Sequence, residues 1–357
     1  MQEIEDFFSK HHILLDSPLA IGVSGGADSL AAVLLIRKTF PELPLVALTV
    51  DHKLRPTSSD EANYVASIMQ KFGIEHHTLV WEGDKPQTGI EEKARIARYD
   101  LLCGWCREHS ISALVLAHHA FDQAETFLMR LQRGSGVYGL SAMDEVSSRD
   151  GIMLLRPFLN VHPDFFKQYL KGKNICWVED ESNHCTDFLR VKMRQFLPNM
   201  EAATGISAAK ICAAANNLQR TKSFLEDTIA NIIADKIHIW GVSGCSFDYA
   251  EFLSWHEELR FHILGRLIHR FGADDYAPKA DSLLDLSQNL LNDGFSAQTL
   301  GGCHILKQDL RLWIIKEYRE ENSVYSTDMW EKFTANNPSV RGIKLPFLLK
   351  EALLREK

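Results

Sequence analysis

Small and polar residues gather at residues 24–29, which read Ser-Gly-Gly-Ala-Asp-Ser between two apolar runs. Glycines let a backbone approach an anion closely, and the N–H groups that open a helix attract phosphate. The stretch therefore predicts a phosphate-binding loop made of Ser24, Gly25, Gly26, Ala27, Asp28 and Ser29. The alternative is a Gly-rich turn in which Asp28 or Ser29 caps the following helix.

Asp28 gives this loop a distinctive chemistry. A carboxylate repels a bare phosphate, so its presence indicates a bridging cation, and we assign Mg²⁺ to Asp28. The loop lacks the lysine of the G-x-x-x-x-G-K-[ST] pattern, which disfavours an ATPase that grips the γ-phosphate.

Further polar residues stand at the ends of predicted strands. Asp51 and His52 end one apolar run, and His118 and His119 end another. Asp122 lies just beyond, one helical turn before Glu125. A zinc site at His118, His119 and Asp122 is an alternative, although adjacent side chains on a strand point to opposite faces. His119 could equally be a packed core histidine.

Basic residues with helical spacing form two more candidates. Glu91, Arg95 and Arg98 share one helix face, which is either turned to phosphate or substrate or is a surface salt-bridge face. Arg190 and Arg194 form a basic spot that also contains Lys192. The net charge of −8 means that any nucleic-acid binding needs such a local surface. The alternative is an amphipathic helix with solvated bases.

The elements that must position these residues alternate along the first half of the chain. Strand-like and helix-like segments in this order predict an α/β fold with a doubly wound parallel sheet. Ligands bind at the carboxyl ends of such strands. The expected strands are 19–23, 45–50, 77–81, 113–117 and 152–155, and the expected helices lie near 29–39, 58–72, 90–109 and 121–132.

The second half changes character. Amphipathic helices at 206–236, 250–271 and 279–293 precede short strands around a Gly-Gly turn. We predict a catalytic domain over 1–205, a mainly helical domain with a small β-hairpin over 206–321, and a linker with a short tail over 322–357. Seven scattered cysteines, an acidic start and the absence of a long apolar run predict a cytoplasmic protein with no membrane partner.

Two short sequence motifs lie in structural surroundings that do not suit the function each motif is known for. GSGVYG at 134–139 follows a predicted helix rather than a strand, so it does not indicate dinucleotide binding. CGWC at 103–106 lies late in a predicted helix without a second cysteine pair, which favours two packed cysteines over a zinc or redox site.

The loop at 24–29 resembles the pyrophosphate loop of the N-type ATP pyrophosphatases. Together with TVDHKLRPTSSDEA, EEKARIARYDLL, LAHHAFDQAETFLMRLQRGSGVYGL and WVEDESNHCTDFLRVKMRQFLP, in this order, it resembles the tRNA(Ile)-lysidine synthetases over about residues 18–200. The resemblance implies ATP and Mg²⁺ as cofactors, isoleucine tRNA with a CAU anticodon and free L-lysine as partners, and a homodimer. In the implied reaction, ATP adenylates the wobble cytidine with release of pyrophosphate, and lysine then displaces AMP.

The resemblance also implies site residues. The implied catalytic residues are Asp28, Asp122, Glu125 and Arg95. The implied nucleotide-binding residues are those of the loop together with Asp51, His52 and His118. The residues implied to contact the tRNA or lysine are Glu91, Arg98, His119, Arg133, Asp180, Asn183, Arg190 and Arg194.

The sequence departs from the family pattern at two positions. Phe121 stands where the family has an acid, and Val191 where it has Asn. Two other functions stay open. The CGWC cysteines suggest a tRNA thiolase, in which they deliver sulfur or hold an iron–sulfur cluster, and Phe121 suggests a catalytically impaired tRNA-binding relative.

Overall fold

The computed structural model describes residues 2–55, 57–83, 85, 88–179, 189–272, 278–318, 324–337, 340 and 343–355. The chain divides into two compact units, residues 1–222 and 223–357. The division falls inside a long helix, α9 (Ala208–Lys236), close to the predicted domain boundary at 205/206, which stays a prediction.

The first unit is built on a six-stranded sheet whose order is β3-β2-β1-β4-β6-β5. All strands are parallel except β5, which pairs antiparallel with β6. The predicted doubly wound sheet is confirmed, with one polar edge strand added that the sequence did not suggest. The strands are β1 (Leu19–Gly22), β2 (Leu45–Asp51), β3 (Glu75–Val80), β4 (Ala113–Val115), β5 (Val146–Arg149) and β6 (Ile152–Leu155).

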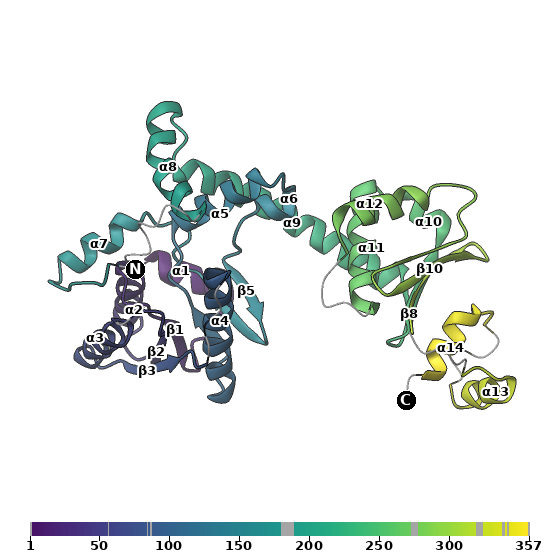
Figure 1. Cartoon of the computed structure of the whole chain (residues 1–357), viewed down its shortest axis with the longest axis horizontal. Helices are drawn as coiled ribbons and strands as arrows, with labels where there is room; N and C mark the ends of the chain where they lie inside the picture. Colours follow the sequence, from purple (N-terminus) through teal and green to yellow (C-terminus); the bar gives the residue numbers. More distant parts are fainter. Residues whose placement is uncertain are drawn as a thin grey trace. The chain divides into compact units, whose positions relative to one another are not determined.

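Helices cover both faces of this sheet (Figure 1). One face packs against α1 (Gln2–Lys10), α2 (Ala27–Thr39), α3 (Ser58–Lys71) and α7 (Pro163–Lys171). The other face packs against α4 (Ile90–Glu108). Strand residues alternate between these two cores, as Leu154 lies on the α4 face and Leu155 on the α2 face.

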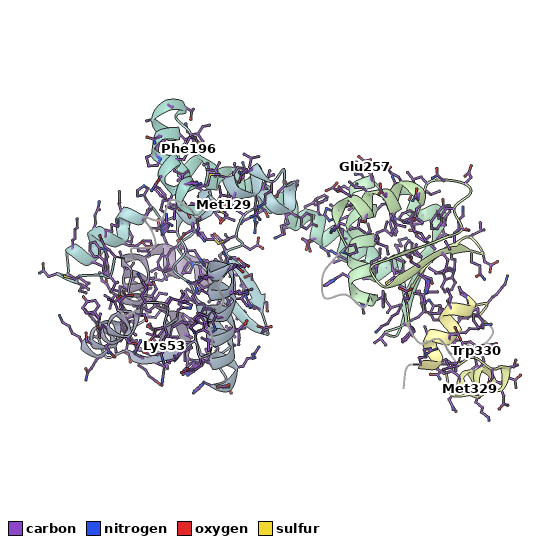
Figure 2. All side chains as sticks on the ribbon, in the orientation of Figure 1. Lys53, Met129, Phe196, Glu257, Met329 and Trp330 are labelled. Atoms are coloured by element: carbon purple, nitrogen blue, oxygen red, sulfur yellow. The ribbon has the colours of Figure 1, made fainter. Side chains whose placement is uncertain are left out.

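The order of connections reverses at β1, because β2 lies on one side of it and β4 on the other. In open α/β sheets this reversal opens the crevice in which ligands bind. The carboxyl ends of the parallel strands form one edge of the sheet, and we call it the active-site edge. Three helices lie beyond this edge (Figure 1): α5 (Ala120–Gln132), α6 (Val137–Leu140) and α8 (Leu189–Thr204). Helices α5 and α8 pack side by side, and Figure 2 marks them with Met129 and Phe196.

The second unit holds a five-stranded antiparallel sheet of order β7-β8-β11-β10-β9. This sheet is larger than the predicted hairpin, since it also includes β7 and β8. These strands were not predicted because they are too short to give a pattern in the sequence. Its strands are β7 (His238–Trp240), β8 (Gly244–Asp248), β9 (Ala297–Leu300), β10 (Cys303–Gln308) and β11 (Arg311–Lys316). Gly301 and Gly302 turn the chain with φ of +57° and +74°.

Helices also cover both faces of the second sheet. One core packs α10 (Tyr249–Ser254), α11 (Glu257–Phe271) and α12 (Ala280–Asn289) against the strands. A second core surrounds Trp240 and Trp313 with α13 (Thr327–Asn336) and α14 (Phe347–Arg355). Helix α13 forms within the stretch 322–340, for which the composition predicts a linker. Among the described residues, no helix has both the length and the apolar character that crossing a membrane demands.

Candidate active site

The loop at 24–29 joins β1 to α2 at the point of reversal. Gly25 has φ of +86°, and a Cβ there would lie 3.1 Å from Val65 Cγ2. The Ser29 hydroxyl accepts a hydrogen bond from the Ser24 N–H at 3.0 Å and donates one to the Gly26 carbonyl at 3.1 Å. The N-cap of α2 is Gly26, not Asp28 or Ser29, and no side chain caps the helix. The first N–H groups of α2 are thus left for an anion.

Asp28 faces a histidine from the next strand along the sheet. Its carboxylate is about one-third exposed and lies 3.5 Å from His119 Nε2. An accessible carboxylate at the mouth of a phosphate loop fits Mg²⁺, which binds through one or two carboxylates together with substrate phosphates. Within the described ranges no group of three or more His, Cys, Asp or Glu residues could hold a metal, and the zinc alternative gains no support.

His119 is buried and caps α5. Its Nδ1 accepts a hydrogen bond from the Asp122 N–H at 3.3 Å, and the Asp122 carboxylate accepts one from the His119 N–H at 3.0 Å. Burial opposes charge on this imidazole, but the carboxylates of Asp122 and Asp28 outweigh it and raise the His119 pKa. One side chain therefore links the start of α5 to the start of α2.

Two acids and two arginines form what we call the ion-pair network: Asp122, Glu125, Arg190 and Arg194. Arg190 donates to Glu125 Oε2 at 2.7 Å and to Asp122 Oδ1 at 2.8 Å. Arg194 donates to Glu125 Oε1 at 2.5 Å and to Asp122 Oδ1 at 3.3 Å. The predicted basic spot on α8 thus contacts the predicted catalytic acids on α5.

The network fixes the charge of its members. Burial favours the neutral form of Asp122, but His119 and Arg190 overcome it and hold the Asp122 pKa well below its usual range. Glu125 is fully buried, and both of its oxygens accept from an arginine. The arginines hold both carboxylates in fixed positions.

A second group lies on the α4 face of the same edge, and we call it the cationic edge: His52, Arg98, His118 and Arg156. His52, His118 and Arg156 follow β2, β4 and β6, and they continue the alternation that places Val50, Leu116 and Leu154 on this face. The Arg156 N–H donates to the Glu145 carbonyl at 2.9 Å, which extends the β5–β6 pairing by one residue. Arg156 was not among the predicted site residues, although it follows a predicted strand directly, as the two histidines do.

In the part of the chain that the structure describes, each residue of the cationic edge has a buried nitrogen without a hydrogen-bond partner. Arg98 Nε, Arg156 Nε, His52 Nδ1 and His118 Nδ1 are all buried and have no partner among the described residues. Burial lowers the pKa of His52, and Arg98 lowers it further. Burial lowers the His118 pKa to about 3, against the opposing charge of Asp122. Both imidazoles are therefore neutral, and the arginines supply the positive charge.

The Tyr99 ring lies beside this group and contacts several arginines. Its buried ring has Arg98 at 5.3 Å, Arg149 at 5.0 Å and Arg95 at 5.9 Å from the centroid. Burial raises the pKa of the phenol, but Arg98, Arg156 and Arg95 together bring it below the ordinary value. The local field at this side of the edge is strongly positive.

Asp51 has a different environment from the one that its predicted place in the nucleotide site suggests. One carboxylate oxygen accepts from the Lys53 N–H at 2.8 Å and the Ser58 hydroxyl at 2.7 Å. The other accepts from the Ser59 hydroxyl at 2.8 Å. Burial favours its neutral form, but these donors prevail and lower the Asp51 pKa. The carboxylate ties the end of β2 to the start of α3, and its nucleotide contact stays a prediction.

The remaining predicted residues lie at the margin or outside the described parts. Arg95 on α4 and Arg133 at the end of α5 are exposed. Both are close enough to lower the pKa of Arg130, whose burial lowers it first. Asp180 and Asn183, and the side chain of Glu91, lie outside the described residues.

Phe121, which stands where the resemblance implies an acid, makes apolar contacts. Its ring packs on a small core between α5, α8 and α9 that includes Leu197 and Ile211. It also meets the His162 ring edge-on, with centroids 5.0 Å apart. The acids that the structure brings to this end of α5 are Asp122 and Glu125.

The CGWC cysteines lie in the core under α4. Cys103 and Cys106 are both fully buried, and burial raises the pKa of Cys106 to about 12. Thiols of this kind do not provide the thiolates that a cluster or a sulfur carrier needs. The packing therefore favours two core cysteines over the thiolase alternative.

Comparison with known proteins supports the fold. A family model described as a PP-loop domain matches residues 1–201. The U34-tRNA thiolase NcsA from Methanococcus maripaludis, solved with its [4Fe-4S] cluster, has a similar fold, with a TM-score of 0.52 and 16% identity over 61% of this chain and 76% of that one. At this identity the likeness concerns the fold alone.

Curated relatives are much more similar in sequence. A tRNA(Ile)-lysidine synthase from Ruegeria pomeroyi is 34% identical over 90% of this chain and 77% of its own length. Another, from Wolbachia pipientis wMel, is 35% identical over 85% of this chain and 71% of its own length. The fold, the loop at the point of reversal and these identities together establish that the chain belongs to the tRNA(Ile)-lysidine synthase family.

Proposed function

We propose that this chain ligates free L-lysine to C2 of the wobble cytidine in the CAU anticodon of isoleucine tRNA. In the first step, the C2 oxygen attacks the α-phosphate of ATP and releases pyrophosphate. In the second, the ε-amine of lysine attacks C2 and displaces AMP, giving lysidine. The observation that carries this proposal is the similarity to tRNA(Ile)-lysidine synthases over 90% of the chain. The open start of α2 behind the loop supports it.

The leaving pyrophosphate is the proposed ligand of the loop. The backbone around Gly25 and Gly26 and the uncapped start of α2 offer N–H groups to its oxygens. Asp28 would hold Mg²⁺ there, and the cation, when bound, neutralises charge that develops on the leaving group.

The ion-pair network is the proposed site for lysine. Asp122 keeps its negative charge at neutral pH because its pKa is held so low, which makes it a strong partner for an ammonium group and a poor proton acceptor. Arg190 and Arg194 hold both carboxylates in place, so that lysine binds preformed anions. Arg95 and Arg133, exposed beside the edge, are proposed to contact the tRNA. The cytoplasmic location and the homodimer stay predictions.

The test is incubation with ATP, Mg²⁺, labelled lysine and tRNA bearing a CAU anticodon. We expect label to enter the RNA, together with AMP release. Asp28→Asn should reduce incorporation by about 100-fold, since it removes the cation ligand at the leaving group. Asp164→Asn is a matched control: Asp164 is also the second residue of its helix, and it lies 3.6 Å from a histidine. This control should incorporate label at the parental rate.

Three results would contradict the proposal. Incorporation that survives Asp28→Asn would remove Asp28 from catalysis. AMP release that does not depend on lysine would exclude the ligation, because the proposed first step uses ATP but leaves AMP on the tRNA until lysine displaces it. Absence of any reaction in a folded protein would favour the catalytically impaired relative, to which the apolar Phe121 points.

A further inference from the structure

We infer that Arg156, together with Arg98, forms a phosphate-binding subsite on the α4 face of the active-site edge. The inference deepens the proposed function and rests on it for the identity of the phosphate. It assigns a residue that the loop chemistry does not require.

Arg156 is buried without an opposing charge among the described residues. The residue is 8% exposed, and its Nη1 donates to two neutral acceptors, the Asp144 carbonyl at 2.9 Å and the Ser147 hydroxyl at 3.0 Å. Its Nε has no partner. No carboxylate in the described part of the chain forms an ion pair with it. A buried cation in this state is costly unless an anion joins it.

The surroundings, as far as the structure describes them, do not supply that anion. Asp51 and Asp122, the acids nearest to the two histidines, already accept hydrogen bonds from other donors. Arg98 likewise has a buried Nε without a partner. Among the described residues, the two arginines of the cationic edge therefore present positive charge and an unpaired donor each, and the two neutral imidazoles add a ring nitrogen each without a partner.

Arg156 also lies at the same edge of the sheet as the phosphate loop. Leu116, two residues before His118, donates its N–H to the carbonyl of Leu155, directly before Arg156. β4 is also the immediate neighbour of β1, whose end carries the loop. Arg156 thus stands two strands from the phosphate loop, at the same edge. Guanidinium groups pair with phosphate or carboxylate oxygens, and the edge shared with the phosphate loop favours phosphate here.

Two sources of phosphate occur in the proposed reaction: ATP with its product pyrophosphate, and the tRNA backbone. The experiment measures binding of Mg²⁺-pyrophosphate and of ATP to the whole chain without tRNA or lysine. It then measures binding of tRNA without nucleotide at several salt concentrations. Failure of lysine incorporation and failure of phosphate binding are therefore separate results.

Arg156→Gln is expected to weaken pyrophosphate and ATP binding by 10- to 100-fold, as for one charged hydrogen-bonding contact, with tRNA affinity changed less than twofold. If the phosphate belongs to the RNA, tRNA affinity falls instead, and the slope of log K against log salt drops by about one. Arg156→Lys keeps the charge and should restore most of the lost affinity.

Arg149→Gln is the matched control. Arg149 lies over the same Tyr99 ring but pairs with Asp100 at 2.7 Å and Asp150 at 3.6 Å. It should change no phosphate affinity by more than twofold. The inference is overturned if Arg156→Gln leaves both pyrophosphate and tRNA affinities within twofold of the parent. It is also overturned if Arg156→Lys binds no better than Arg156→Gln, because both would then report lost packing.

Discussion

The ion-pair network and the cationic edge lie at the same edge of one sheet, but their charges are paired differently. In the network, two arginines meet two carboxylates, and each carboxylate accepts from both arginines. In the cationic edge, two arginines and two neutral histidines meet no carboxylate, and four of their nitrogens have no partner in the described part of the chain. The charges of the network are balanced before any substrate binds, whereas those of the cationic edge are not. Balanced charge offers lysine carboxylates that are already in position, and unbalanced charge indicates where the substrate brings its own.

The largest expected effect comes from breaking the network. Glu125→Gln leaves two arginines against one carboxylate at a fully buried position. It should lower the free energy of unfolding by about 3 kcal/mol, because an uncompensated buried charge remains. Urea denaturation of the ligand-free protein measures this change. A loss below about 1 kcal/mol would mean that the network is no more than a surface ion pair, and the comparison would fail.

A pH titration of stability separates the two regions. His118 stays neutral in the folded chain, since burial holds its pKa near 3, while an unfolded histidine takes up a proton below about pH 6.5. Stability is therefore complete above pH 6.5 and falls as pH drops towards the folded pKa. The lowered pKa of Asp122 delays loss of the network until pH falls below the unfolded value of about 3.9.

His118→Gln should flatten the fall between pH 6 and 4 by about 1.4 kcal/mol per pH unit, the contribution of one proton. The measurement is urea denaturation at several pH values. His269→Gln, an exposed histidine of the second unit, should leave the slope unchanged. An unaltered slope in the His118 variant would show that the cationic edge does not hold this imidazole neutral.

The smallest effect is expected from an arginine outside both groups. Arg149 pairs with Asp100 and Asp150, and its side chain is one-third exposed. Arg149→Gln should change the free energy of unfolding by less than 1 kcal/mol in urea denaturation, because exposed ion pairs contribute little. A loss as large as that of Glu125→Gln would remove the distinction between buried and exposed pairs on which the comparison depends.

Local pattern was enough to predict the elements that carry the site. The apolar runs gave the five parallel strands, and the glycines and Asp28 marked the loop that follows β1. The periodicity of α5 predicted that Asp122 and Glu125 share one face, and that of α8 did the same for Arg190 and Arg194. These inferences concern residues close in sequence, whose geometry a single element determines.

The pairing between these faces could not be predicted in the same way. Arg190 and Glu125 are 65 positions apart, and nothing in either helix states that α5 and α8 pack together. Asp51 shows the same limit, because its three donors depend on the turn from β2 into α3. Arg156 was missed since a lone arginine after a strand has no spacing pattern, and its lack of a carboxylate partner appears only in three dimensions.

Because the His119 side chain contacts two helices, the loss of activity in a His119 variant can have two causes. The imidazole caps α5 through Nδ1 and faces Asp28 through Nε2. Truncating it therefore frays a helix start and isolates a carboxylate at once, and lost activity in an alanine variant would not distinguish scaffold from chemistry. Asparagine caps helices well but has no counterpart of the imidazole Nε2 that faces Asp28. An asparagine variant therefore separates the loss of the helix cap from the loss of the contact with Asp28. At this position the choice of substitution decides what question is asked.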